Sequence, residues 1–130
     1  MLLQTTLSLA AAAAIINFWL GVRIGQLRQA LKVSVGTGGH EQIERRMRAQ
    51  LNFAENVPLL LILIGLVEAA GKGGAWLAPV GALLMVGRVL HGLGMDGGKL
   101  AWGRSFGTAI TMLATIGLAV VAVLIALGKI

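Results

Sequence analysis

The chain contains no cysteine, and it has only two histidines. Without cysteine it forms no disulfide, binds no metal through thiolates and has no thiol nucleophile of its own. Any sulfur chemistry must therefore use a sulfur atom that a substrate brings. His40 and His91 lie in different regions without a supporting cluster of ligands, so the sequence predicts no metal site.

Charge is also scarce. Charged residues make up 12% of the 130 residues and hydrophobic residues 57%, and the mean hydropathy is +0.86. This composition is typical of a membrane protein and not of a soluble domain. The net charge of +6 does not indicate a nucleic-acid partner, because the cations border apolar stretches and are not interleaved with exposed aromatics. Anionic lipid headgroups and an anionic ligand are the expected partners.

Four stretches are apolar enough to cross about 30 Å of hydrocarbon, which takes about 20 residues in a helix. They are residues 3–22, 57–70, 75–93 and 106–127. The second reaches full length only with the polar segment that begins near Glu41. The first has no Lys or Arg ahead of it and is too long for a signal peptide, so we expect a spanning helix. The sequence predicts a single all-α domain over residues 1–130, an up-down bundle of four transmembrane helices.

Glycine-rich breaks at residues 36–39, 71–74 and 92–98 separate the predicted helices. Because the breaks are short, consecutive helices should be antiparallel neighbours. Basic residues gather around the first and third connections: Arg23, Arg28, Lys32, Arg45, Arg46, Arg48, Arg88, Lys99 and Arg104. These connections fall on one side of the bundle, and the positive-inside rule predicts that this side is cytoplasmic, with both termini outside.

The most informative segment is residues 48–58, which carries Arg48, Asn52 and Glu55 directly into a run of leucine and isoleucine. At about 100° per residue, these three side chains and Arg45 fall within a narrow arc of one helical face. Charged side chains at membrane depth are functional candidates. A cation, an amide and a carboxylate on one face predict a site for a polar ligand.

The other predicted helices also carry polar stripes. The first has Asn17, Gly21, Gly25, Arg28 and Lys32, the third has Arg88 and His91, and the fourth has Arg104, Thr108, Thr111 and Thr115. Gly21 and Gly25 have the spacing of small residues that lets helices approach closely. All four helices therefore direct polar groups inward near the same end.

These motifs resemble those of a known family. The matching features are Arg48-Ala49-x-x-Asn52-x-x-Glu55-x-x-Pro58, Arg88-x-x-His91, and Arg104 at the start of the fourth helix. The family is that of membrane-associated proteins in eicosanoid and glutathione metabolism (MAPEG), which includes microsomal glutathione transferases, leukotriene C4 synthase and microsomal prostaglandin E synthase. The resemblance covers most of the chain, and the short length and glycine-rich first loop are similar to the family's small bacterial members.

The resemblance implies a homotrimer in a bacterial inner membrane, with glutathione bound between neighbouring subunits at the cytoplasmic end. It implies that Arg48, Asn52 and Glu55 hold the tripeptide, with Glu55 facing its ammonium and Arg48 a carboxylate. The other residues implied as glutathione contacts are Arg28, Gln50, Arg88 and His91. Arg104 matches the position at which a family arginine approaches the thiol, so it is the expected catalytic residue.

The chemistry of glutathione is compatible with these residues. The tripeptide carries two carboxylates, one ammonium and one thiol, so its site needs cations, an acceptor and a group that stabilises sulfur as an anion. A thiol with a pKa of about 8.5 is mostly protonated at pH 7, and lowering that pKa by about two, worth about 2.7 kcal/mol, makes the thiolate predominant. An arginine can do this because it stays protonated. A lipophilic second substrate would arrive from the bilayer, followed by thiolate attack or peroxide reduction.

One departure from the family is that this chain contains no tyrosine. Several relatives place tyrosines among their glutathione contacts, and Asn56 and Met95 stand where some of them have aromatic hydroxyls. Ser105 or Thr108 could replace a hydroxyl near Arg104. The missing phenol weakens the expectation of catalysis more than that of binding.

Structural interpretations of the same residues remain open. Glu55 could form an ion pair with Arg48 or Arg88, since buried polar groups also fix helix packing in membranes. His91 could hydrogen-bond within the core instead of contacting a ligand. The residues interpreted as interfacial or packing groups are Arg23, Lys32, Arg45, Arg46, Glu68, Thr108, Thr111 and Thr115.

Two other functions remain as alternatives. The first is a non-catalytic membrane protein of the same fold that binds glutathione or a lipid. The second is a small four-helix multidrug exporter, in which an acidic residue in helix one normally carries the proton coupling. The first predicted helix here contains no acid, which disfavours an exporter.

Overall fold

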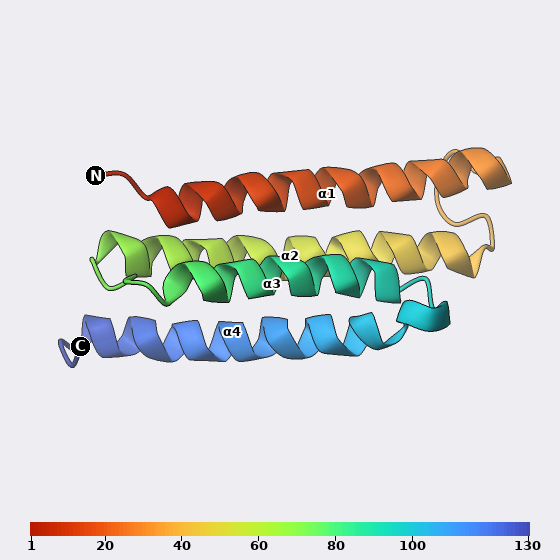
Figure 1. Cartoon of the computed structure of the whole chain (residues 1–130). Helices are drawn as coiled ribbons and strands as arrows, with labels where there is room; N and C mark the ends of the chain where they lie inside the picture. Colours follow the sequence, from red (N-terminus) through yellow and green to blue (C-terminus); the bar gives the residue numbers. More distant parts are fainter.

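The computed structural model describes residues 1–130 and consists of four long α-helices joined by short connections (Figure 1). The helices are α1 (Gln4–Leu31), α2 (Glu41–Ala69), α3 (Leu77–Gly94) and α4 (Trp102–Ala126), and a short 3₁₀ helix, η1 (Gly98–Leu100), precedes α4. Figure 1 shows that successive helices alternate in direction and that both termini lie at the end where α2 turns into α3. The predicted all-α up-down bundle is confirmed.

The first helix carries its predicted polar stripe beyond the apolar stretch. It continues past residue 22 to Leu31, and its C-cap Lys32 has a left-handed backbone (φ 57°) whose N–H donates to the carbonyl of Arg28. The extension carries the polar part of the α1 stripe alongside the first turns of α2. Arg28 therefore lies beside the Arg-rich start of α2.

Each helix buries one apolar stripe in a shared core. On α2 the buried residues are Ile43 and, recurring every three or four positions, Ala49, Phe53, Val57, Leu60, Ile64 and Val67. The opposite face of α2 exposes large apolar side chains: Leu51, Leu59, Ile62 and Leu66. All four helices are long and apolar enough to cross a membrane, so this outer surface is suited to lipid or to another subunit.

Glycines bring α3 and α4 into backbone contact. A Cβ atom on Gly103 would lie 2.3 Å from the carbonyl oxygen of Leu90, and a Cβ on Gly107 would lie 2.3 Å from that of Gly87. Only residues without side chains fit at these positions. The close crossing fixes the start of α4, which carries Arg104, against the end of α3.

The close helix approach predicted at Gly21 and Gly25 is wrong within the chain. A Cβ on Gly25 would meet nothing within 4 Å, and one on Gly21 would meet only the Nε2 of Gln50, at 3.3 Å. The spacing of small residues identifies a smooth helix face but not what covers that face. On α1 this face lies open.

Gly107→Ala should lower the free energy of unfolding by about 1–3 kcal/mol, because the new methyl group would collide with the main chain of Gly87. Gly117→Ala is the matched control on the same helix, since its Cβ would meet nothing within 4 Å. The control should be neutral or stabilising by up to about 1 kcal/mol, because alanine has the higher helix propensity. Circular dichroism during unfolding in detergent measures both, and equal stability of G107A and wild type would contradict the crossing.

At the arginine-rich end, defined here as the end with the α1–α2 and α3–α4 connections, Asp96 links three segments. Its carboxylate accepts hydrogen bonds from Arg23 and, at 3.1 Å, from both Nε and Nη2 of Arg46. Arg45 donates to the carbonyl of Met95 at 3.2 Å. These arginines were expected to lie in lipid headgroups. In the structure they tie the α3–α4 connection to α1 and α2.

At the opposite end, Glu68 caps the first turn of α1. Its carboxylate accepts hydrogen bonds from the backbone N–H groups of Thr5 (2.9 Å) and Thr6 (2.7 Å) and from the Thr6 hydroxyl (2.7 Å). A negative charge is stabilising at this position because the N-terminal N–H groups of a helix lack partners. The sequence placed Glu68 at the outer end but did not reveal this cap.

Candidate functional site

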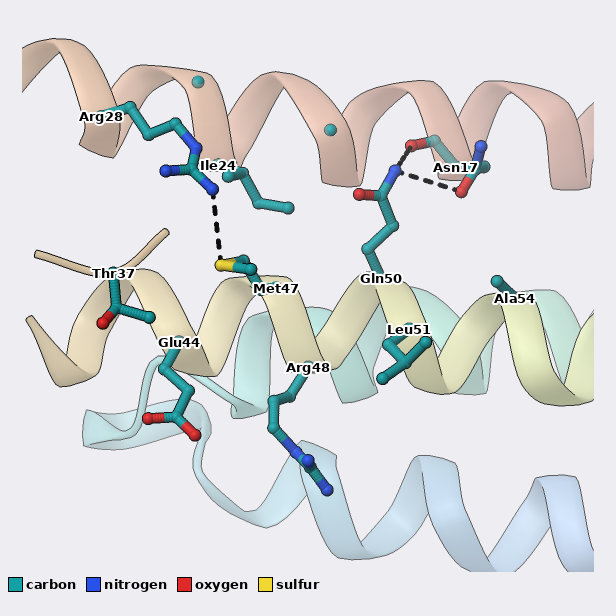
Figure 2. A pocket seen from close by; sticks show the side chains of 12 residues that line it. Asn17, Ile24, Arg28, Thr37, Glu44, Met47, Arg48, Gln50, Leu51 and Ala54 are labelled. Carbon is teal, nitrogen blue, oxygen red and sulfur yellow. Dashed lines mark hydrogen bonds between the residues drawn. The ribbon is translucent and has the colours of Figure 1, made fainter. Parts of the chain in front are cut away.

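A groove of about 930 Å³ lies between α1 and α2, toward the arginine-rich end (Figure 2). The lining residues are Asn17, Gly21, Ile24, Gly25 and Arg28 of α1, Thr37 of the connection, and Glu44, Met47, Arg48, Gln50, Leu51 and Ala54 of α2. Its volume is within the range of about 300–1,000 Å³ that is common for small-molecule sites. The missing side chains at Gly21 and Gly25 keep the groove open.

Polar contacts hold the two walls of the groove together. The Nε2 of Gln50 approaches the backbone oxygen and the Oδ1 of Asn17 at 3.4 and 3.3 Å. Arg28 donates to the carbonyl of Gly36. Its Nη2 lies 3.4 Å from the sulfur of Met47, the contact that is dashed in Figure 2. The structure thus brings three of the predicted site residues, Arg28, Arg48 and Gln50, to the groove.

A second hollow of about 350 Å³ adjoins the groove. Its lining residues are Glu41, Glu44, Arg45, Arg48, Met95 and Arg104. Glu44 and Arg48 line both spaces, and in Figure 2 both side chains extend from α2 away from α1. Arg48 and Arg104 make no ion pair within the chain, so both guanidinium groups are available to an anion.

Glu55 lies further along the same face of α2. Its side chain is exposed and forms no ion pair with any residue of the chain. The alternative pairs of Glu55 with Arg48 or Arg88 are therefore not formed within one subunit. Glu55 lines neither the groove nor the hollow, so one subunit alone does not bring all the predicted contacts together.

Asn52 of α2 forms a hydrogen bond with Arg88 of α3 at the side of α2 that faces the core. Arg88 is only 1% exposed, and its Nη2 donates to the Oδ1 of Asn52 at 2.7 Å. Its Nη1 donates to the hydroxyl of Thr111 at 3.1 Å, and its guanidinium carbon lies 5.8 Å from the centre of the Phe53 ring. The predicted contact Arg88 thus lies in the core and outside the groove, with Asn52 half-buried between it and the surface.

His91 also lies in the core. It is 4% exposed, and its buried Nδ1 has no hydrogen-bond partner. A Cβ on Gly107 would lie 2.6 Å from the Cβ of His91, so the ring is packed where α3 and α4 cross. His91 therefore lies in the core, but the core hydrogen bond of the alternative interpretation is not formed at Nδ1.

Several groove residues were not predicted from the sequence. Thr37, Glu44 and Met47 line the groove, and Asn17 bonds to Gln50 across it. The signal that could have found Asn17 was its place on the same stripe as Gly25 and Arg28. No feature of the sequence singled out the other three.

Comparison with known proteins agrees with this architecture. Residues 6–124 match the model of the MAPEG family. Among curated relatives, the inner membrane protein YecN of Escherichia coli strain K12 is 28% identical over 97 residues, which are 74% of this chain and 73% of the relative. YecN of Escherichia coli O6:H1 gives the same identity and coverage. The family match spans nearly all of the four helices, and the chain therefore belongs to the MAPEG family of membrane proteins.

Proposed function

We propose that this protein is a glutathione-dependent membrane transferase or peroxidase. It binds glutathione at the arginine-rich end and activates the thiol for attack on a lipophilic electrophile or hydroperoxide. The observation that carries this proposal is a set of exposed charges on α2 and α4: Arg48, Arg104 and Glu55 make no ion pair in the chain. Charged side chains of a membrane helix that no residue of the chain neutralises are candidate ligand contacts.

The residue roles follow from charge and position. Arg28 and Arg48 bind the carboxylates of glutathione, Gln50 contacts a peptide group, and Glu55 accepts a hydrogen bond from the ammonium. Arg104, across the hollow from Arg48, donates to the sulfur and stabilises it as a thiolate. Its exposed position at the start of α4 leaves room for a second substrate to reach the thiol.

A homotrimer would complete the site. Glu55 does not line the groove of its own subunit. Beyond Glu55, the same side of α2 exposes the apolar side chains of Leu59, Ile62 and Leu66. Packing this face against the α1–α2 groove of a neighbour would place Glu55 of one subunit near Arg28 and Gln50 of the next. Three such contacts form a closed ring.

The proposed location is the inner membrane, which is also named for the relative YecN. The helix ends and connections at the arginine-rich end together carry most of the basic residues, so the positive-inside rule assigns this end to the cytoplasm. Glutathione would then enter from the cytoplasm, and both termini would lie outside.

The test of this function is whether the purified protein ionises and uses glutathione. We expect ultraviolet absorbance of a thiolate on adding glutathione at neutral pH, and conjugation of chlorodinitrobenzene by the wild-type protein. The absence of saturable glutathione binding by the folded protein would reject the function.

The second candidate is a non-catalytic protein that binds glutathione or a lipid at the same site. The observation that favours it is the scarcity of hydroxyls near Arg104. The chain has no tyrosine, and the hydroxyl of Thr108 donates to the carbonyl of Arg104 within the helix at 2.8 Å. Only Ser105 remains of the two predicted substitutes. Glutathione binding without thiolate absorbance would support this candidate.

Glu55→Gln should weaken glutathione binding by about tenfold or more, because a charge-assisted hydrogen bond to the ammonium is lost. Its thermal midpoint should be close to that of wild type, since Glu55 has no partner in the chain. Glu68→Gln is the reciprocal control: it removes a charge that caps α1, so it should melt earlier but bind glutathione normally. Calorimetric binding and thermal unfolding of both variants measure this contrast, and normal binding by E55Q would contradict the role of Glu55.

A further inference from the structure

Three helices are joined in the core by one chain of hydrogen bonds. The Thr111 hydroxyl of α4 donates to the carbonyl of Gly107 at 2.7 Å and accepts from Nη1 of Arg88 on α3 at 3.1 Å. Nη2 of Arg88 then donates to Oδ1 of Asn52 on α2 at 2.7 Å. Thr111 is 3% exposed and Arg88 is 1% exposed, so neither contacts the groove.

The direction of every bond in this chain is fixed by chemistry. A guanidinium has donors and no acceptor, so the atom of Asn52 that faces Arg88 must be the amide oxygen. The hydroxyl proton of Thr111 is directed at Gly107, so an oxygen lone pair faces Arg88. The amide nitrogen of Asn52 therefore points away from Arg88, and it donates no hydrogen bond to the core residues around Arg88.

No carboxylate compensates the charge of Arg88. The three ion pairs of the chain involve Arg23, Arg45 and Arg46, and the Nε of Arg88 has no partner. Burying a cation in this way is unfavourable, because full ion pairing or solvation is lost. An apolar residue would fill the same space at lower cost, so packing alone does not account for Arg88 and its two partners.

We propose that Thr111 and Arg88 are positioning residues that fix the amide of Asn52 with its Nδ2 outward, toward a ligand at the face of α2 that also carries Glu55. Asn52 then serves only as a donor, and the group it binds is an acceptor of glutathione, a carboxylate or peptide oxygen, and not the ammonium. The ammonium is left to Glu55. This inference rests on the proposed function. It adds that Asn52 acts toward the ligand only as a hydrogen-bond donor and that Thr111 helps to hold it in that orientation.

Asn52→Asp tests whether Asn52 donates a hydrogen bond to the ligand. The variant keeps an oxygen for Arg88 and gives the buried guanidinium a counter-charge, so its thermal stability should equal or exceed that of wild type. It replaces the donor Nδ2 by an acceptor, so affinity for glutathione should fall about tenfold or more. If N52D binds glutathione as well as wild type, or more tightly, Asn52 does not donate to the ligand and the inference is overturned.

Thr111→Val tests the positioning role. Valine has the shape of threonine but offers no acceptor to Nη1 of Arg88, so the amide of Asn52 is no longer held. We expect glutathione affinity to fall about fivefold, with kcat at saturating glutathione near wild type. Thr111→Ser should restore affinity. Thr115→Val is the matched control, because the Thr115 hydroxyl bonds only the backbone carbonyl of Thr111.

A double-mutant cycle separates positioning from general loosening of the core. In an Asn52→Ala background, Thr111→Val should cause no further loss of affinity, because its effect passes through Asn52. An additive loss would show that Thr111 acts independently and would overturn its assignment. Failure of the folded wild-type protein to bind glutathione would overturn the proposed function together with this inference, whereas wild-type binding with an unaffected N52D overturns only the inference.

Discussion

Arg104→Ala is expected to lower kcat by about 100-fold or more, while the Kd for glutathione changes by less than about threefold. Arg104 lies at the hollow beside the groove and makes no ion pair in the chain. A preorganised cation acts on the anion that forms at the sulfur, and it acts much less on the neutral thiol that binds first. Steady-state conjugation of chlorodinitrobenzene and calorimetry on the same preparation measure the two quantities.

Two further variants sharpen this experiment. Arg104→Lys keeps the charge but loses the planar fork, so it should recover part of kcat. Lys99→Ala removes an exposed cation from η1, which precedes α4, and should leave kcat near wild type. A Kd that rises as much as kcat falls in R104A would show that Arg104 binds a carboxylate and does not act on the sulfur.

Gly25→Leu is expected to weaken glutathione binding by about 30-fold or more, because the side chain would fill the groove. A Cβ at Gly25 meets nothing within 4 Å, so the substitution has no neighbour to displace within the subunit. Leucine also has a higher helix propensity than glycine. The loss of affinity should therefore occur in a protein whose helix content and thermal midpoint are unchanged.

Gly117→Leu is the matched control for the groove. Gly117 lies on α4 in an apolar depression between α3 and α4, and its Cβ would also meet nothing within 4 Å. The same chemical change at this distant position should leave glutathione binding at the wild-type level. Binding losses of similar size in G25L and G117L would show that the groove is not the site.

The number and order of the helices could be predicted from the sequence because apolar runs and glycine-rich breaks are local signals. The extension of α1 to Leu31 could also be predicted, because its polar stripe reaches Lys32 and the first glycine-rich break begins only at Gly36. The contacts of Arg28 with the first connection and with Met47 of α2 could not, because they join segments that are separate in the sequence.

The two glycine pairs show a second limit of the sequence. Gly21 and Gly25 on α1 and Gly103 and Gly107 on α4 have the same spacing, yet the first pair borders an open groove and the second forms a backbone crossing. The spacing specifies a face without side chains. The surrounding helices determine whether that face is filled by a backbone or left for a ligand.

The candidate site was predicted in part. Periodicity placed Arg48, Asn52 and Glu55 on one face of α2, and the structure keeps Arg48 and Glu55 exposed there. The bond of Asn52 to Arg88 and that of Arg88 to Thr111 join three helices, so no pattern within one helix could reveal them. The same reason explains why Asp96 was not recognised as the partner of Arg23 and Arg46.

Calorimetry of glutathione binding to the purified, detergent-solubilised protein tests the central claim most directly. The account predicts saturable binding by wild type, retained in R104A and G117L and strongly weakened in E55Q and G25L. No saturable heat from folded wild-type protein, or equal affinity of wild type, E55Q and G25L, would contradict a glutathione site at the arginine-rich end of the bundle.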